Sequence, residues 1–251
     1  MIKPHGIIKH GIGAWGKAYD SKLVLNLDSR ISASITEGAG AVSDWVDVVG
    51  NHNFEQDNAG DKPSYAANRV TFNDDFMSAG DIPSLELSAF SVHVVLKRDG
   101  IGDTQYIWCQ QGDISKVGDD SAGGCFLRFT SDNELGLVSY SEPAIATTAY
   151  TATSVAKLTD TTNYHLFTGI FGVTALKIYL DGTLIASGPY PGAGYRKVRA
   201  TAVGAAMQSQ GGANANRFRG KLGQVLVYDG AHTHSKAVAV SNQIMADWSI
   251  S

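Results

Sequence analysis

Apolar residues recur at every second position in four separate runs, a period that is typical of β-strands and not of helices. The runs contain Leu23, Leu25 and Leu27; Phe90, Val92, Val94 and Leu96; Leu176, Ile178 and Leu180; and Leu222, Leu226 and Tyr228, which share their face with Gln224. Such alternation buries one face of each strand and leaves the other face in water. The pattern predicts an all-β fold of two packed antiparallel sheets.

One dipeptide fixes a hairpin in this pattern. Asp181-Gly182 separates residues 177–180 from residues 183–186, and both segments read as strands. Asp-Gly favours the two-residue type I′ turn, because both central residues of that turn need a positive φ. We therefore predict a β-hairpin that turns at these two residues.

The C-terminal segment has a helical period instead. Ala237, Val240, Ile244 and Trp248 lie on one side of a helix expected over residues 235–248. Ser235 is the expected N-cap. This short helix should pack its apolar stripe across the sandwich.

The chain has 251 residues, of which 43% are hydrophobic, and sandwiches of this length are commonly one domain. We find no internal repeat or linker after residue 21, so residues 22–251 are predicted to form one domain.

The formal net charge of −4 gives no sign of nucleic-acid binding. No stretch approaches the roughly 20 apolar residues of a membrane span, and no signal peptide is visible, so we expect the protein to be made in a cytoplasm.

Residues 1–21 read as an N-terminal arm. Glycines interrupt any regular pattern there, and Trp15 and Tyr19 stand among them as candidate anchors. The arm either docks on a neighbouring subunit or straps over its own core.

The chain contains two cysteines, Cys109 and Cys125. In a symmetric hairpin around residues 116–118 they would face each other, which would allow a disulfide. Because no export signal is visible, we expect reduced thiols in the core.

The order of several short motifs resembles the concanavalin A-like lectin/glucanase superfamily, in its laminin-G-like branch. The motifs are Trp45 with Asp47, Gly50-Asn51, Pro63, Phe72 with Asp75, residues 90–95 (FSVHVV), residues 177–184 (KIYLDGTL) and residues 218–228 (FRGKLGQVLVY). The resemblance covers roughly residues 23–248 and implies a jelly-roll sandwich. The terminal residues 246–250 (ADWSI) resemble modules of bacteriophage structural proteins.

Some relatives are glycoside hydrolases that carry catalytic carboxylates in an E-x-D-x-E arrangement, where positions two apart share one face of a strand. Glu55 and Glu134 each have one aspartate two positions away, Asp57 and Asp132, but no segment has the full E-x-D-x-E arrangement. We therefore expect no catalytic residues and no enzymatic activity. Asp44 and Asp47 flank Trp45, and we expect a core tryptophan with loop-bracing aspartates in preference to a sugar site.

Loops supply the remaining candidate sites. Relatives often hold calcium in rim loops, which implies that calcium is a possible cofactor here. Its candidate ligands are Asp113, Asp119 and Asp120. A solvated acidic loop is the preferred interpretation of these residues. Candidate ligand-binding residues are Tyr190, Tyr195, Arg196, Arg199 and Arg217, which combine an aromatic loop with a basic patch if the side chains converge. For the basic residues, solvated strand edges are the preferred interpretation. His232 and His234 lack a third metal ligand nearby, so a helix-capping or solvent-facing role is preferred.

The leading hypothesis is a non-enzymatic bacteriophage virion protein, a surface capsid decoration or a fibre-like module. It would be assembled into virions in the host cytoplasm, contact capsid or tail subunits and form a homo-oligomer. The alternative is a carbohydrate-binding adsorption module that recognises host surface polysaccharide. A glycoside hydrolase or lyase is the third hypothesis.

Overall fold

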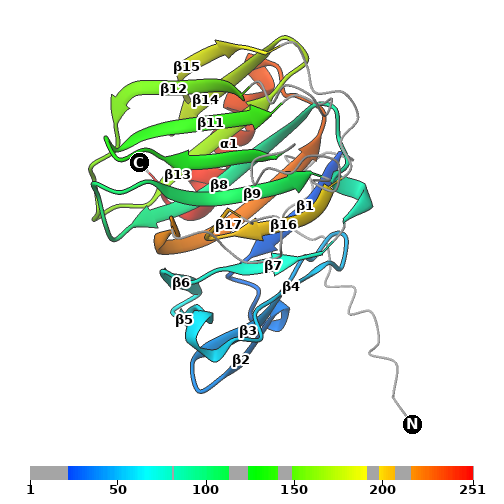
Figure 1. Cartoon of the computed structure of the whole chain (residues 1–251), viewed down its shortest axis with the longest axis vertical. Coiled ribbons are helices and arrows are strands. Elements are labelled where there is room, and N and C mark those ends of the chain that lie inside the picture. Colours follow the sequence, from blue (N-terminus) through cyan, green and yellow to red (C-terminus); the bar gives the residue numbers. More distant parts are fainter. Residues whose placement is uncertain are drawn as a thin grey trace.

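The computed structural model describes residues 22–80, 82–112, 124–140, 149–190, 198–206 and 216–250. Two antiparallel sheets pack face to face, and one helix covers the outer side of one of them (Figure 1). The sheet that faces the viewer in Figure 1 is called the front sheet, and the sheet beneath the helix is called the back sheet. This jelly-roll-like sandwich confirms the predicted fold class.

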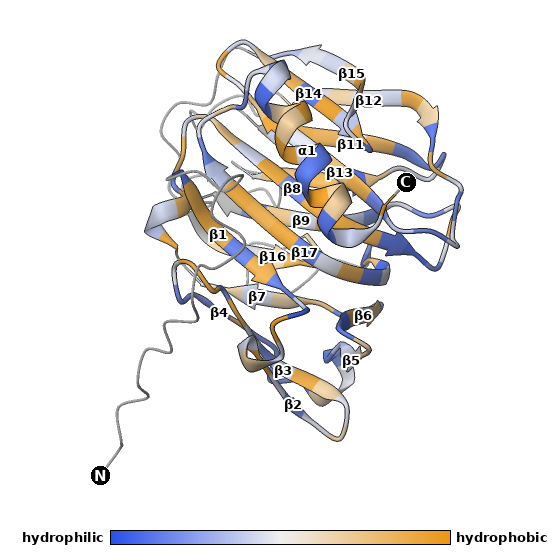
Figure 2. Cartoon of the chain, turned by 180° about the vertical axis from the view of Figure 1, so that it is seen from behind, coloured by the Kyte–Doolittle hydropathy of each residue, from blue (hydrophilic) through white to orange (hydrophobic). Residues whose placement is uncertain are grey.

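The back sheet is centred on β17, which pairs with β1 and β6 along one edge and with β8 along the other. Its strands are β1 (Leu23–Asp28), β6 (Arg69–Asn73), β17 (Arg219–Asp229), β8 (Phe90–Arg98), β13 (His165–Phe171), β14 (Ala175–Leu180) and β15 (Thr183–Pro189). The helix α1 (His234–Trp248) lies across its outer side (Figure 2).

The front sheet runs in the order β7, β16, β9, β10, β11, β12. Its strands are β7 (Met77–Ala79), β16 (Val198–Val203), β9 (Gln105–Gly112), β10 (Cys125–Phe129), β11 (Glu134–Tyr140) and β12 (Ala149–Lys157). Four short strands connect β7 to β6 around one side: β2 (Ile35–Gly38), β3 (Ala41–Val46), β4 (Asn53–Glu55) and β5 (Ser64–Ala66). Single 3-10 turns occur at Ser32–Ser34, Ala59–Asp61 and Pro83–Leu85.

The main core lies between the two sheets and includes the fully buried Trp45, Trp108, Leu137 and Phe167. A second cluster joins Leu226 and Tyr228 of the back sheet to Val240 and Ile244 of α1. Because α1 supplies this second layer, β8, β13 and most of β17 are buried on both faces. The expectation that each run would leave one face in water was therefore wrong for the runs in β8 and β17.

A β-bulge changes the face that Leu222 occupies. The register between β17 and β8 shifts between Leu222 and Gln224, so Leu222 packs in the core between the sheets while Gln224 turns to the helix side. A Cβ atom at Gly223 would lie 2.6 Å from the ring of Trp248, so a residue without a side chain is needed there. The prediction that Leu222, Gln224, Leu226 and Tyr228 share one face was wrong at Leu222, because a bulge reverses the alternation.

The predicted hairpin and helix are confirmed. Asp181 and Gly182 have φ angles of 48° and 74°, as a type I′ turn requires. The helix spans His234–Trp248 and buries the predicted stripe. Its N-cap is Thr233, whose hydroxyl accepts a hydrogen bond from the Lys236 amide at 3.3 Å, so the assignment to Ser235 was wrong by two residues.

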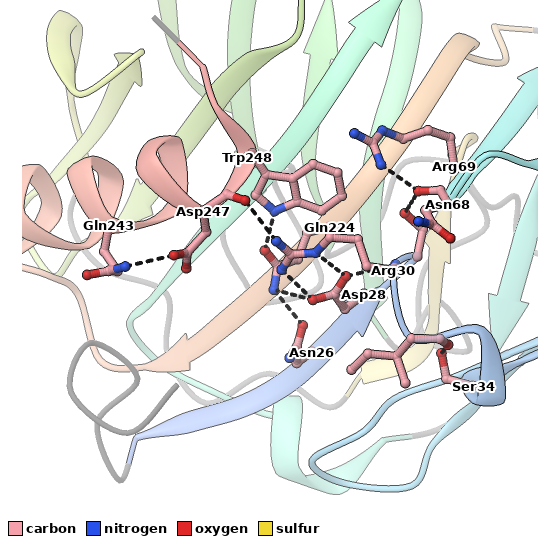
Figure 3. Close-up of polar contacts among 12 residues, drawn as sticks. Asn26, Asp28, Arg30, Ser34, Asn68, Arg69, Gln224, Gln243, Asp247 and Trp248 are labelled. Atoms are coloured by element: carbon pink, nitrogen blue, oxygen red, sulfur yellow. Dashed lines mark hydrogen bonds and ion pairs between the residues drawn. The ribbon is translucent and has the colours of Figure 1, made fainter. Parts of the chain in front are cut away.

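The end of α1 is held by Trp248. Its ring lies between the guanidinium groups of Arg30, at 4.2 Å, and Arg69, at 4.3 Å, and its Nε1 donates to Gln224 at 2.9 Å (Figure 3). Gln224 in turn donates to Asp28, the carboxylate that Arg30 binds. The helix thereby joins β17 and the end of β1. Among the described residues, no helix is long and apolar enough to cross a membrane.

The two cysteines are both buried thiols, as expected. The predicted opposition across a hairpin was wrong by one position, because Cys125 pairs with Gln110 and Cys109 pairs with Phe126. Successive residues of a strand point to opposite faces, so the two sulfur atoms lie on opposite sides of the front sheet. The arm at residues 1–21, with Trp15 and Tyr19, lies outside the described residues, and its docking stays a prediction.

Candidate functional site

The outer side of the front sheet, away from the core, carries two adjacent rows of side chains in register. One row crosses four strands as Tyr106 on β9, Arg128 on β10, Gly136 on β11 and Thr153 on β12. Four strands span about 14 Å between the outermost backbones. The next row contains Ala202, Cys109, Phe126, Val138 and Thr151.

These rows combine partly exposed rings with small and hydroxyl-bearing neighbours. Tyr106 and Phe126 are partly buried, and their rings meet edge to face with centroids 5.4 Å apart. Both pack on the buried side chains of Cys109 and Ala202. Thr153 is exposed at the far end of its row. We call Tyr106, Phe126, Arg128, Gly136 and Thr153 the front-face site.

Arg128 lies flat over the middle of this site. A Cβ atom at Gly136 would lie 3.5 Å from Cγ of Arg128, so the side chain rests on the glycine. Its Nη1 donates to the Tyr106 hydroxyl at 3.4 Å, and its guanidinium carbon lies 5.9 Å from the centre of that ring. Glycine at residue 136 leaves room for Arg128 to lie along the sheet.

The sequence did not single out these residues, because they are spread over four strands. A weak signal was present in β10, where Phe126 and Arg128 alternate with the core residues Leu127 and Phe129. An aromatic residue and a cation in outward positions are unusual enough to mark a strand, but the register that aligns them with Tyr106 depends on long-range pairing.

Tyr190 does not belong to an exposed loop, as the sequence had suggested. Its side chain is only 2% exposed, and its hydroxyl accepts a hydrogen bond from Ser139 at 3.0 Å. The ring meets Tyr150 edge to face at 5.7 Å. Tyr190 is part of the core, so its substitution by alanine would test stability and not ligand binding.

The side chain of Arg217 also binds other residues of the fold. It forms an ion pair with Asp61, donates to the Asp74 carbonyl at 2.8 Å and stacks on Phe76 at 5.0 Å. Its neighbour Arg219 lies 2.9 Å from Asp74 and 3.5 Å from Asp103. These aspartates neutralise Arg217 and its neighbour Arg219.

The other predicted site residues stay predictions. Tyr195 and Arg196 lie outside the described residues, and Arg199 lies in β16 with a side chain that the structure does not describe. The calcium candidates Asp113, Asp119 and Asp120 also lie outside them, so the calcium site stays a prediction. In the described part of the chain, no group of three His, Cys, Asp or Glu side chains could hold a metal ion.

Trp45 and Asp47 have the structural roles that were preferred for them. Trp45 is fully buried, and Asp47 accepts hydrogen bonds from the amides of Asn26, Val49 and Gly50 at 2.7 to 3.0 Å. Burial nevertheless raises the pKa of Asp47 above its ordinary value, against the opposing effect of these amides. The carboxylate therefore closes the turn after β3.

Asp44 belongs to a carboxylate pair that leaves no spacing signal in the sequence. It faces Glu55 across β3 and β4, and the amide nitrogen of Asn53 donates to both carboxylates, at 2.8 and 2.7 Å. Glycoside hydrolases use two carboxylates, but they also need a bound sugar between them. This pair lies on the exposed short strands and not at the front-face site.

His232 and His234 support the helix start. The His234 ring stacks on Tyr179 at 5.8 Å, and its Nδ1 lies 3.2 Å from the Tyr179 hydroxyl. His232 lies 3.3 Å from the buried His93, whose other ring nitrogen is 2.9 Å from the Thr168 hydroxyl. The pair therefore contributes to packing beneath α1.

Solved structures share this fold over most of its length. Domain 4 of AbnA, a GH43 extracellular arabinanase from Geobacillus stearothermophilus in complex with arabinotriose, is 17% identical with a TM-score of 0.63, and the match covers 88% of this chain and 98% of that domain. The Trypanosoma rangeli sialidase in complex with sialic acid is 14% identical with a TM-score of 0.62, over 91% of this chain and 34% of the sialidase. The binding domain of Paraclostridial Mosquitocidal Protein 1 is 12% identical with a TM-score of 0.58, over 89% of this chain and 52% of that domain.

These identities establish a shared fold and no shared activity. Comparison with curated protein sequences gave no match. The family model described as the concanavalin A-like lectin/glucanases superfamily matches residues 71–237, which is well over half of the chain. The chain belongs to the concanavalin A-like lectin/glucanase superfamily.

Proposed function

We propose that the protein is a carbohydrate-binding module and that its glycan lies across the front-face site. The observation that carries the proposal is the partly exposed pair Tyr106 and Phe126 beside Arg128 on the side of the sandwich opposite α1. Aromatic rings offer a flat apolar surface to the C–H face of a sugar ring, while a few polar groups orient its hydroxyls. The shared fold with an arabinanase domain and a sialidase supports this class of ligand.

The direct test is retention of soluble polysaccharides by the purified protein in affinity electrophoresis. Tyr106→Ala should weaken binding about tenfold, because it removes the stacking ring. Tyr164→Ala is the matched control, since Tyr164 is also partly buried and stacks on an arginine, Arg69, but packs against the cluster beneath α1. Equal losses in both variants, or no retention of any glycan by the wild type, would refute the proposal.

A virion location is a separate proposal. It rests on the resemblance of residues 246–250 to modules of phage structural proteins, and the predicted capsid or tail partners and homo-oligomeric state belong to it. Mass spectrometry of purified particles would test it: many copies indicate a capsid decoration, a few copies indicate a tail position, and absence of the chain refutes it.

The expected lack of enzymatic activity is likewise a proposal. It rests on the absence of the E-x-D-x-E arrangement from the sequence and on the position of Asp44 and Glu55 on β3 and β4, outside the front sheet. Release of reducing sugar from any polysaccharide that the module retains would contradict it, and loss of that release in Glu55→Gln would assign the activity to the pair.

A further inference from the structure

The guanidinium of Arg128 is a cation that the described part of the fold leaves without a carboxylate. We infer that the ligand of the front-face site is an acidic glycan, and that a carboxylate on a sugar ring binds Arg128. This inference rests on the proposed function and adds the charge of the ligand to it.

The surroundings of Arg128 give its guanidinium few hydrogen-bond partners within the described part of the fold. Its Nε is buried and has no hydrogen-bond partner, and Nη1 has only the long contact of 3.4 Å to the neutral Tyr106 hydroxyl. The side chain is partly buried against Gly136 and the tyrosine ring. A cation that has lost part of its hydration in this way gains more free energy from pairing with an anion than an exposed cation does.

Three other arginines in the described part of the chain are neutralised by carboxylates of the fold, whereas Arg69 stacks on Trp248 and Arg98 is buried on Phe129. Arg30 lies 2.7 Å from the Asp28 carboxylate, Arg217 pairs with Asp61, and Arg219 lies 2.9 Å from Asp74. Glu134 is the acidic residue two positions before Gly136 on β11. It is opposite Lys157 in the register with β12 and forms no ion pair with Arg128.

The geometry favours a carboxylate within a sugar over a free anion. A guanidinium presents several donors in one plane, which suits the two oxygens of a carboxylate. The rings of Tyr106 and Phe126 lie on the same side of the sheet as Arg128, and Thr153 offers a hydroxyl on the other side of Gly136. A hexuronate unit has all three matching features: a carboxylate, an apolar ring face and free hydroxyls.

The test compares one oligosaccharide with and without its charge. Isothermal titration calorimetry with a galacturonate oligomer and with its fully methyl-esterified form changes the carboxylates and leaves the sugar backbone alone. The wild-type protein should bind the acid roughly tenfold to a hundredfold more tightly. Raising the salt concentration from about 50 mM to about 500 mM should reduce this preference, because a partly exposed ion pair is screened.

Arg128→Gln should abolish the preference for the acid, and Arg128→Lys should keep part of it. Arg69→Gln is the matched control for net charge. Arg69 also stacks on aromatic rings and has a buried Nε without a partner, but it belongs to the clamp around Trp248. Arg69→Gln should keep the wild-type preference, and thermal unfolding of each variant checks that it is folded.

Two outcomes separate this inference from the proposed function. If acid and ester bind equally, or if only a neutral glycan binds and Tyr106→Ala weakens it, the acidic ligand is refuted and the carbohydrate-binding module stands. If neither these oligomers nor any polysaccharide binds, both proposals are refuted.

Discussion

Arg98 places a charged group inside the sandwich with little to neutralise it. The residue is fully buried at the end of β8, and its guanidinium stacks on Phe129 at 4.0 Å. It donates to the Leu158 carbonyl at 2.8 Å and to Asn133 at 3.3 Å, which ties two connections of the front sheet to the back sheet. Burial lowers the pKa of Arg98 to about 10, so the side chain stays protonated at neutral pH.

Substitutions at Arg98 should separate the contribution of its side-chain volume to stability from the contribution of its charge. Arg98→Ala is expected to lower the free energy of unfolding by about 3 kcal/mol or more, because it leaves a cavity and an unpaired Leu158 carbonyl. Arg98→Met should cost clearly less, since it fills most of the space and removes a desolvated charge. Urea unfolding of both variants measures the difference, and an equal loss in both would contradict this role for the side-chain volume.

Single residues were the least predictable part of the fold. Tyr190 follows Pro189 and precedes Pro191 and Gly192, a composition that indicates a loop, yet packing against Tyr150 buries it. Arg217 finds its carboxylate at Asp61, far away in the sequence. Neither partner leaves a local pattern, because both contacts depend on how the strands are ordered in space.

At the scale of elements, two histidines of the back sheet should make the stability of the protein depend on pH in opposite directions. His165 lies at the start of β13 between Asp181, at 2.7 Å, and Asp160, at 3.3 Å. Its hydrogen bond to Asp181 is the main cause that raises the pKa of His165 above 6.5. The same carboxylate accepts the Leu166 amide, so this cluster fixes the turn between β14 and β15.

His165→Gln should therefore destabilise the protein most in mildly acidic solution. A group whose pKa is raised on folding contributes its full stability below the unfolded pKa of about 6.5, and that contribution is lost as the pH rises through the folded pKa. The melting temperatures of wild type and variant should differ at about pH 5.5 and converge in alkaline solution. A gap that widens with rising pH would contradict the assignment.

His93 should act in the opposite sense beneath α1. Burial, and then the nearby His232, lower its pKa well below 6.5, and the hydroxyls of Thr168 and Ser241 share the same buried polar cluster. A lowered pKa means that stability is present above the unfolded pKa of about 6.5 and is lost as the pH falls below it. Wild type should lose melting temperature from about pH 7 to about pH 5, and His93→Gln should lose less. An equal loss in both proteins would show that another group titrates.

Elements with local signals were predicted well. The turn at Asp181-Gly182 and the stripe of α1 depend on neighbouring residues, and both are confirmed. The second buried face of β8 and the bulge at Gly223 were not predicted, since both follow from the docking of α1. The register of Cys109 and Cys125 was missed by one residue for a similar reason, because the hairpin is not symmetric.

At the scale of the whole molecule, the two outer sides of the sandwich differ in what they can do. The back sheet is covered by α1, and Trp248 fixes the end of that helix to β17 and to Arg30 (Figure 3). The front sheet instead displays Tyr106, Phe126 and Arg128 in partly exposed positions. The ordered motifs were sufficient to predict the superfamily, but the front-face site arises only when four strands align.

Backbone chemical shifts recorded during titration with a bound glycan would locate the ligand on one of these sides. Binding at the front-face site should shift the amide signals of β9, β10 and β11 around Tyr106, Arg128 and Gly136, and leave the signals of α1 unchanged. Shifts that gather on α1 and the back sheet, with none around Tyr106 and Arg128, would contradict the placement of the glycan on the front sheet.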